Sequence, residues 1–352
     1  MSWGTGRAGP GPRRGWQVER TLDDVEADED REPGRRKSPA VTALLVLAAL
    51  GFLGWAALPL TGYDSNRYAA ALVALTQYAV PVGLLLVVLA LVLRRWLTTL
   101  VVGLVTAALV ASVAPRAIPD PPTPVQGTPL NVMSANLYFG EADAARIVEL
   151  VRSNDVDVLS LQELTPALAA ALDRAGLAQV LPHRVFEAHP GAEGTGIASR
   201  YPLRSLALVP PTTMRQPSAL VDLPGSRDVE FVAVHPVIPV GSDTVGDWRR
   251  EITVLPHTPA EGRPPRVLAG DFNATLDHSP LRGLLGRGYA DAAEVAGAGL
   301  APTWPRAGAW LPPPVTIDHV LVSEGVVVQD YRTFEVAGAD HRAVVAHLVV
   351  AG

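Results

Sequence analysis

Three apolar runs without a charged residue fill most of the first third of this chain, at residues 40–60, 68–93 and 97–114. Each is close to the roughly 20 residues that a helix needs to cross the hydrocarbon core of a bilayer. Lipid offers the backbone no hydrogen-bond partner, so such runs fold there as helices. Three buried core helices, or a cleavable signal peptide behind the polar residues 1–38, fit this succession of runs poorly. The sequence therefore predicts three transmembrane helices.

Basic residues flank these runs unevenly. Residues 35–37 are Arg-Arg-Lys and residues 94–95 are Arg-Arg, whereas only Arg67 and Arg116 lie at the other ends of the runs. Because short cytoplasmic segments carry the excess of Arg and Lys, the N-terminus and the 94–95 turn are expected inside the cell. Three spans then predict a multi-pass plasma-membrane protein whose remaining chain is extracytoplasmic.

Two polar segments border the apolar region. Residues 1–38 are rich in Gly, Arg, Pro and acidic residues, a composition typical of a disordered tail. Residues 115–129 contain six prolines and predict an extended, semi-rigid linker that keeps the next domain near the membrane without rigid attachment. The expected organisation is a cytoplasmic tail (1–38), a three-helix transmembrane region (39–114), the linker (115–129) and a catalytic domain (130–352).

Within the last region, the apolar residues 267–269 run into Gly-Asp-Phe-Asn at 270–273. Alternation along a strand sends Asp271 and Asn273 to one side and Phe272 back into the core. One polar group can then orient or deprotonate a water while the other binds a phosphoryl oxygen. A simple turn is the alternative, since Gly, Asp and Asn all favour turns.

Polar residues end or begin five other apolar segments of residues 130–350. They are Asn136, Gln162-Glu163, His235, Asp318 and Asp340-His341. In this order the segments resemble the endonuclease/exonuclease/phosphatase superfamily of metal-dependent phosphoesterases. Each motif alone is weak, but the ordered set is specific.

Strands in this region alternate with helical patterns, such as the apolar stripe within residues 141–154 and the Ser279-Pro280 helix start. Interleaved strands and helices indicate the α/β class. The resemblance further implies a four-layer sandwich of two packed mixed sheets flanked by helices.

The resemblance also implies a metal site. Glu163 would be the principal ligand, with Asp340 and Asn136 completing the protein side of the site. Carboxylate and amide oxygens suit Mg²⁺, with Mn²⁺ as the alternative. The chain has no cysteine, which excludes a thiolate site.

By the same resemblance, Asp271 positions or deprotonates the attacking water and Asn273 hydrogen-bonds the phosphoryl group. Asp318 would bind the far nitrogen of His341, and either His341 or Asp271 would be the general base. His235 would donate to a phosphoryl oxygen or assist the leaving group. The remaining candidates carry less weight: Trp304 fits a substrate wall or a packed loop anchor equally well, His319 is expected to support the site, and His183, His189, His257, His278 and His347 match no catalytic position.

Three spans, a Pro-rich linker and this domain together resemble the glycopeptide-resistance membrane proteins of actinomycetes. This implies a phosphohydrolase that acts outside the cytoplasm on phosphate or pyrophosphate esters, such as isoprenyl lipid carriers. Tethering favours a substrate in the membrane by raising its effective concentration.

Two other functions compete with this one. An extracytoplasmic nuclease is less favoured, because the net charge is −6 and the chain's single lysine, Lys37, lies in the tail. A catalytically inactive receptor or scaffold would be expected to lose metal or acid/base residues, and none is lost. The sequence identifies no partner protein.

Overall fold

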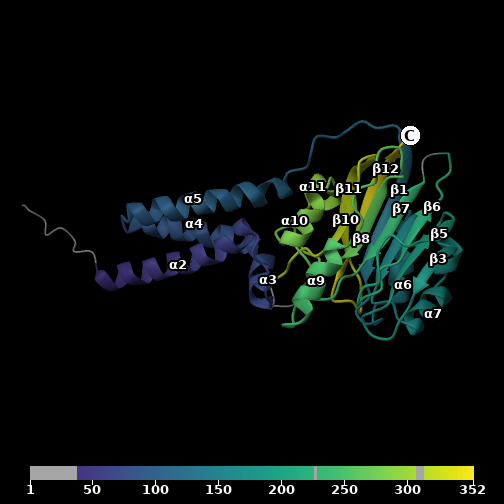
Figure 1. Cartoon of the computed structure of the whole chain (residues 1–352), viewed down its shortest axis with the longest axis horizontal. Helices are drawn as coiled ribbons and strands as arrows, with labels where there is room; N and C mark the ends of the chain where they lie inside the picture. The colour runs from purple at the N-terminus through teal and green to yellow at the C-terminus, as the bar shows by residue number, and fades with distance from the viewer. Residues whose placement is uncertain (1–37, 226–227, 307–312) are drawn as a thin grey trace, which may run out of the picture. The chain divides into compact units, whose positions relative to one another are not determined.

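The computed structural model describes residues 38–225, 228–306 and 313–352, so the predicted tail lies almost wholly outside the described residues. Two compact units divide the chain, with the boundary between Val46 and Leu47. The second unit contains most of the apolar helices and the whole of the α/β region (Figure 1).

Four helices form the apolar region: α2 (Pro39–Thr61), α3 (Arg67–Ala74), α4 (Thr76–Val92) and α5 (Trp96–Val113). Two described helices, Pro39–Thr61 and Trp96–Ala117, are long and apolar enough to span a membrane. A third span exists only if α3 and α4, which meet at 70°, form one broken span. The second predicted transmembrane helix is therefore a bent pair of helices. Of the three predicted spans, the first and third are single helices long enough to cross a membrane.

The α/β region contains two six-stranded sheets. The first has the order β11-β12-β1-β2-β4-β3 and the second β5-β6-β7-β8-β10-β9. Both are mixed, because β1–β2 and β7–β8 are parallel pairs among antiparallel neighbours. The strands of the first sheet are β1 (Gly127–Asn136), β2 (Val158–Gln162), β3 (His183–Glu187), β4 (Thr195–Ser199), β11 (Val326–Glu335) and β12 (Arg342–Ala351). Those of the second are β5 (Leu203–Leu206), β6 (Ser218–Val221), β7 (Val229–Val234), β8 (Arg266–Asp271), β9 (Ala290–Asp291) and β10 (Asp318–Val322).

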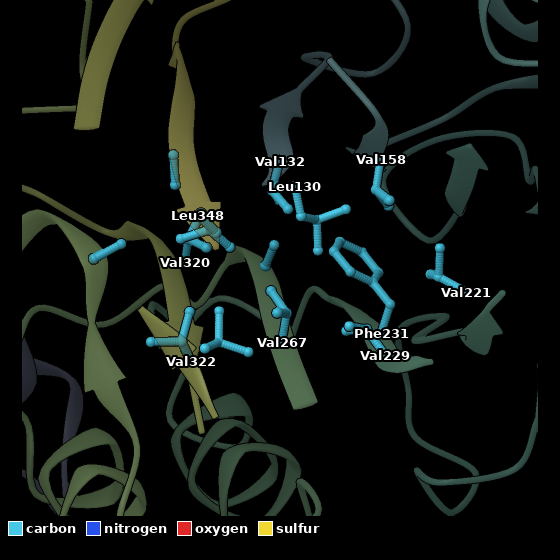
Figure 2. Close-up of a cluster of buried hydrophobic side chains, with 14 of the residues drawn as sticks. Leu130, Val132, Val158, Val221, Val229, Phe231, Val267, Val320, Val322 and Leu348 are labelled. Carbon is cyan, nitrogen blue, oxygen red and sulfur yellow. The ribbon is translucent and has the colours of Figure 1, made fainter. Parts of the chain in front are cut away.

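The two sheets pack face to face over a buried apolar core. Figure 2 shows Leu130 and Leu348 of the first sheet facing Phe231, Val267 and Val320 of the second. Each such side chain contributes about 1.5–3 kcal/mol by leaving water. This core holds the sandwich together.

Helices cover the outer faces of both sheets and complete four layers. The first sheet packs against α6 (Ala144–Ser153), α7 (Pro166–Arg174) and α8 (Leu177–Val180). The second packs against α9 (Thr244–Thr253) and α10 (Ser279–Leu285), while α11 (Ala292–Val295) contacts β10 and β11 (Figure 1). The predicted α/β fold of two mixed sheets flanked by helices is confirmed.

Strand register brings the predicted polar residues to one end of the sandwich. Asn136 pairs with Gln162 between β1 and β2, and Asp318 lies opposite Asp271 between β10 and β8. The Ser160 hydroxyl joins the sheets near this end by donating to the Ala269 carbonyl at 2.8 Å.

Gly270 is required by the close approach of β7 and β8. A Cβ at this position would lie 1.9 Å from the carbonyl oxygen of Val234. Its three nearest neighbours are all backbone atoms of Val234, which cannot move aside as a side chain can. We expect Gly270→Ala to destabilise the protein by about 3 kcal/mol, as overpacking does. The measurement is thermal melting of the detergent-purified protein. Gly283→Ala in α10 is the control, since its Cβ would meet nothing within 4 Å; equal melting of the two variants would contradict this account.

The predicted linker differs from expectation at both ends. Its start forms the 3₁₀ turn Ala114–Ala117, in which Arg116 is buried and pairs with Asp277. Its end already belongs to β1, which begins at Gly127. The prediction of an extended spacer is therefore wrong for the first turn of this segment. That turn is fixed to the catalytic domain, because the buried charge of Arg116 needs a partner.

Candidate active site

An amide bridges two carboxylates at the end of the sandwich. Asn136 Nδ2 donates to Glu163 Oε1 at 3.2 Å and to Asp271 Oδ2 at 3.0 Å. Asn136 Oδ1 accepts from the Tyr138 N–H at 3.0 Å, which fixes the amide plane. Asn136 and Glu163 follow the first sheet and Asp271 ends a strand of the second, so the site lies across the two sheets.

His341 lies between Asp271 and one further carboxylate, Asp318. His341 Nδ1 is 2.9 Å from Asp318 Oδ2, and its Nε2 is 3.7 Å from Asp271 Oδ2. Nδ1 therefore carries a hydrogen that Asp318 accepts, which is the pairing expected from the sequence. The antiparallel register explains the geometry, because it aligns Asp318 and Asp271 on neighbouring strands.

Burial and charge set the protonation of this group. Burial alone would lower the pKa of His341, but Asp318 and Asp271 outweigh it and raise that pKa to about 10. Burial raises the pKa of Asp271 to about 7, against the opposing effect of His341. The imidazole therefore favours its charged form, held between two acids.

Two of the predicted residues have strained backbones. Glu163 has φ = 56° and Asn273 has φ = 49°, in the left-handed region that residues other than glycine rarely adopt. Such strain costs about 1–3 kcal/mol and concentrates at functional sites. Hydrogen bonds hold both conformations, since the Phe139 N–H donates to Glu163 and the Asn273 N–H donates to Asp271 Oδ1 at 2.7 Å.

The donor set fits a hard divalent cation beside Glu163. Its carboxylate is half-buried and its pKa is raised, first by burial and also by the nearby charge of Asp340. A cation would relieve this clustering of negative charge. Asp271, Asp318 and His341 also offer ligand atoms within 4.8 Å of one another. We assign that second cluster to proton chemistry, because the charged ring of His341 leaves no free nitrogen to bind a cation.

Asn273 and His235 flank the site on the second sheet. Asn273 Nδ2 donates to the Pro236 carbonyl at 3.0 Å. The backbone N–H of His235 donates to Gln216 Oε1 at 3.2 Å. Burial lowers the pKa of His235 to about 3, so its imidazole is neutral. Its Nδ1 is buried and has no hydrogen-bond partner among the described residues.

Trp304 contacts a predicted metal ligand. Its indole Nε1 donates to Asp340 Oδ2 at 3.0 Å, and its ring centroid lies 6.3 Å from that of His341. An isolated β-bridge to Val315 fixes its backbone. Trp304 therefore anchors its loop and orients Asp340; of the apolar segment that follows, residues 307–312 lie outside the described residues.

Several residues that support the site were not predicted from the sequence. The Thr303 hydroxyl oxygen accepts from the Asp318 N–H at 3.1 Å, and Gln216 holds His235. Tyr138 and Phe139 expose 40% and 53% of their surface beside Glu163. Only the aromatic pair after Asn136 left a visible signal, because apolar residues directly after a catalytic strand are candidates for substrate contact.

His319 supports the site, as its position beside Asp318 predicted. Its Nδ1 lies 2.8 Å from Asp291 Oδ2 and its Nε2 lies 2.9 Å from the Ala274 carbonyl. Burial lowers its pKa, but Asp291 outweighs this and the net shift is upward. A charged, doubly bound His319 fixes the backbone that follows Asn273.

Known proteins resemble this chain in sequence and fold. The endonuclease/exonuclease/phosphatase family model matches residues 133–341, more than half of the 352 residues. An endonuclease/exonuclease/phosphatase from Beutenbergia cavernae is 23% identical, with a TM-score of 0.52 over 64% of this chain and 72% of that one. D. rerio TDP2 complexed with single-strand DNA product is 18% identical (TM-score 0.49; 63% and 99% covered). Sphingomyelinase C from Streptomyces griseocarneus is 16% identical (TM-score 0.41; 62% and 99% covered).

No curated protein matches the chain. Identities this low support a shared fold alone, and the family match covers the strands that carry the site. On the strength of that match, the chain belongs to the endonuclease/exonuclease/phosphatase family.

Proposed function

We propose that this protein is a membrane-anchored, divalent-metal-dependent phosphoesterase that hydrolyses a phosphate or pyrophosphate ester of a membrane lipid outside the cytoplasm. The observation that carries the lipid substrate is a groove of about 530 Å³ between the apolar helices and the catalytic domain. Its lining includes Tyr78 and Pro81 of α4, Val110 and Val113 of α5, and Leu300 of the catalytic domain. A hydrocarbon chain is the ligand that such a lining suits.

A short series of contacts connects this groove with the active site. Gln77 Nε2 and Tyr78 Oη, which line the groove, donate to the Pro314 carbonyl at 3.1 and 2.8 Å. The next residue, Val315, pairs with Trp304, whose indole holds Asp340. A lipid whose chain lies in the groove would thus have its phosphate beside the loop that borders the site.

The site residues fit the hydrolysis of such an ester. A divalent cation bound by Glu163, Asn136 and Asp340 would supply Lewis-acid stabilisation of the charge on the phosphoryl oxygens. Asp271 and His341 Nε2 lie close enough for one water to contact both. Asp271 accepts the proton of this water, because the charged ring of His341 carries a hydrogen on each nitrogen. The charged ring of His341, held by Asp318, also stabilises the negative charge that develops in the transition state.

Neutral donors complete the phosphoryl pocket. Asn273 is fixed by its contacts with Pro236 and Asp271, and its amide lies beside the attacking group. We assign to the neutral imidazole of His235 a hydrogen bond from its ring N–H to a phosphoryl or leaving-group oxygen. Fixed dipoles of this kind need no reorganisation during the reaction.

The arrangement of basic residues supports an extracytoplasmic catalytic domain. Residues 94–95 form the turn between α4 and α5. Contacts with the catalytic domain come instead from Pro59, Gln77 and Arg116, at the opposite ends of the apolar helices. If the basic turn is cytoplasmic, the catalytic domain lies on the other side.

Lipid and nucleic acid can be compared directly. The full-length protein would be incubated with Mg²⁺ and one of two substrates. Phosphate release would be measured with isoprenyl pyrophosphate in vesicles, and nicking with supercoiled plasmid. We expect faster release from the lipid, because the net charge of −6 disfavours a polyanion. Efficient nicking with no release from any lipid would make the protein a nuclease.

Filling the groove gives a second test. Ala114 lines the groove and is exposed, so Ala114→Trp should block a lipid chain without disturbing the core. We expect its KM for the vesicle lipid to rise about tenfold, the effect of a contact worth 1.4 kcal/mol. Its rate on a soluble p-nitrophenyl phosphodiester should not change. Ala111→Trp, also exposed on α5 but outside the groove lining, is the matched control.

A further inference from the structure

A fully buried acid lies in the connection between α2 and α3. Asp64 is 0% exposed, which is rare for an aspartate unless it is paired. Its Oδ2 accepts from the Ser279 N–H at 2.6 Å, and its Oδ1 accepts from the Ser279 hydroxyl at 2.8 Å. It also forms an ion pair with Arg249 of α9. A residue between two apolar helices thus fixes the start of α10 in the catalytic domain.

A second buried ion pair joins the end of α5 to the same region. Arg116 donates through both terminal nitrogens to the two oxygens of Asp277, each at 2.8 Å. The exposed fractions of these side chains are only 9% and 7%. A two-point arginine–carboxylate pair fixes orientation as well as distance.

A histidine supplies the third contact. His278 Nδ1 accepts from the Thr275 N–H at 2.9 Å, so its Nε2 carries the hydrogen and donates to the Ala70 carbonyl at 3.0 Å. Burial lowers the pKa of His278 to about 4, and the ring is neutral. No local pattern predicts a role for His278, because its partner lies 208 positions away.

All three contacts converge just beyond the catalytic turn. Asp277, His278 and Ser279 follow the turn Asp271–Asn273 within a few residues. Trp248 links the two segments, since its indole donates to the Phe272 carbonyl at 3.3 Å and its ring lies 5.1 Å from that of His278. The strained conformation of Asn273 is therefore bounded on its C-terminal side by a segment tied to the apolar helices.

We propose that Asp64, Arg116 and their partners Arg249, Asp277, His278 and Ser279 form a clamp that positions the Asp271–Asn273 turn for catalysis. The apolar region is then part of the active-site scaffold as well as an anchor. This inference rests on the proposed phosphoesterase activity but not on the lipid substrate. Asp64 and Arg116 are positioning residues, since they touch neither substrate nor metal.

The test uses full-length protein in detergent with Mg²⁺ and soluble bis(p-nitrophenyl) phosphate, so that lipid binding plays no part. Asp64→Asn and Arg116→Gln should each lower kcat at least tenfold while KM changes less than twofold. Arg116→Lys keeps the charge and should recover part of the loss. The exchanged pair Arg116→Asp with Asp277→Arg should recover more activity than either single change. Arg146→Gln is the control, because it removes only surface contacts outside the clamp, the partly exposed pair with Glu149 on α6 and a hydrogen bond to the Glu335 carbonyl, and it should match the wild type.

Hydrogen exchange supplies a readout that does not need activity. The amides of residues 272–274 should exchange faster in Asp64→Asn and Arg116→Gln than in the wild type. Lower melting temperatures with unchanged kcat and unchanged exchange at 272–274 would overturn the clamp. If the wild type hydrolyses no phosphoester, the proposed function fails, and the exchange rates still decide whether the clamp holds the turn.

Discussion

Glu163→Gln is expected to abolish phosphoester hydrolysis at saturating Mg²⁺ while leaving the fold intact. Glutamine keeps the shape but removes the charge that would bind the cation. A bound cation contributes several kcal/mol of transition-state stabilisation, so kcat should fall by roughly 10³-fold. The pKa of Glu163 is raised by burial, which means that the folded protein stabilises the charged carboxylate poorly and the substitution should not reduce stability.

The measurement is kcat across a Mg²⁺ titration, with circular dichroism to check the fold. Glu149→Gln is the matched control, because Glu149 is exposed on α6 and pairs only with Arg146. Full activity of the wild type in excess EDTA would remove the metal from the mechanism.

The pair of Asp318 and His341 should behave as one unit. Asp318→Asn should lower kcat by about 10²–10⁴-fold, because a neutral amide removes the charge that keeps the His341 ring protonated and oriented. His341→Gln should cost a similar factor. The double variant should lose little more than either single variant, since residues that act together are strongly non-additive.

The measurement is a double-mutant cycle of single-turnover rates, with the wild type, Asp318→Asn, His341→Gln and the double variant. Asp330→Asn, which affects an exposed ion pair with Arg332, should match the wild type. Losses that multiply in the double variant would show that Asp318 and His341 act independently.

Local sequence patterns predicted the elements that local physics determines. The apolar run before Asp271 and the polar residues at the strand ends located the site, because alternation and strand register bring such ends together. Periodicity also indicated an α/β domain, although only the family resemblance suggested two sheets packed in four layers.

Long-range contacts left no comparable pattern. Asp64 and Ser279 are 215 residues apart and Arg116 and Asp277 are 161 apart, so no window of sequence contains either pair. A buried ion pair is also selected by the whole surrounding fold, which makes an isolated Asp or Arg look like a surface residue. For this reason the first turn of the predicted linker was expected to be free of the catalytic domain.

Backbone conformation was equally hidden. Glu163 and Asn273 adopt left-handed angles that their residue types disfavour, and only the surrounding hydrogen bonds stabilise them. The second apolar run breaks at Leu75 between α3 and α4, where the sequence Ala74-Leu75-Thr76 contains neither glycine nor proline. Proline inside α4 is accommodated, and the bend occurs before it.

Because Arg116 follows directly on the end of α5 and is fixed to Asp277, the catalytic domain has no loose tether on which to search the surrounding solution. If its apolar helices span a bilayer and its substrate is a lipid, the enzyme diffuses in two dimensions together with that substrate. Its turnover should then follow the mole fraction of substrate in the bilayer, and diluting a fixed amount of substrate with inert lipid should slow it even when the bulk concentration is constant. It should also leave substrate in neighbouring vesicles unhydrolysed.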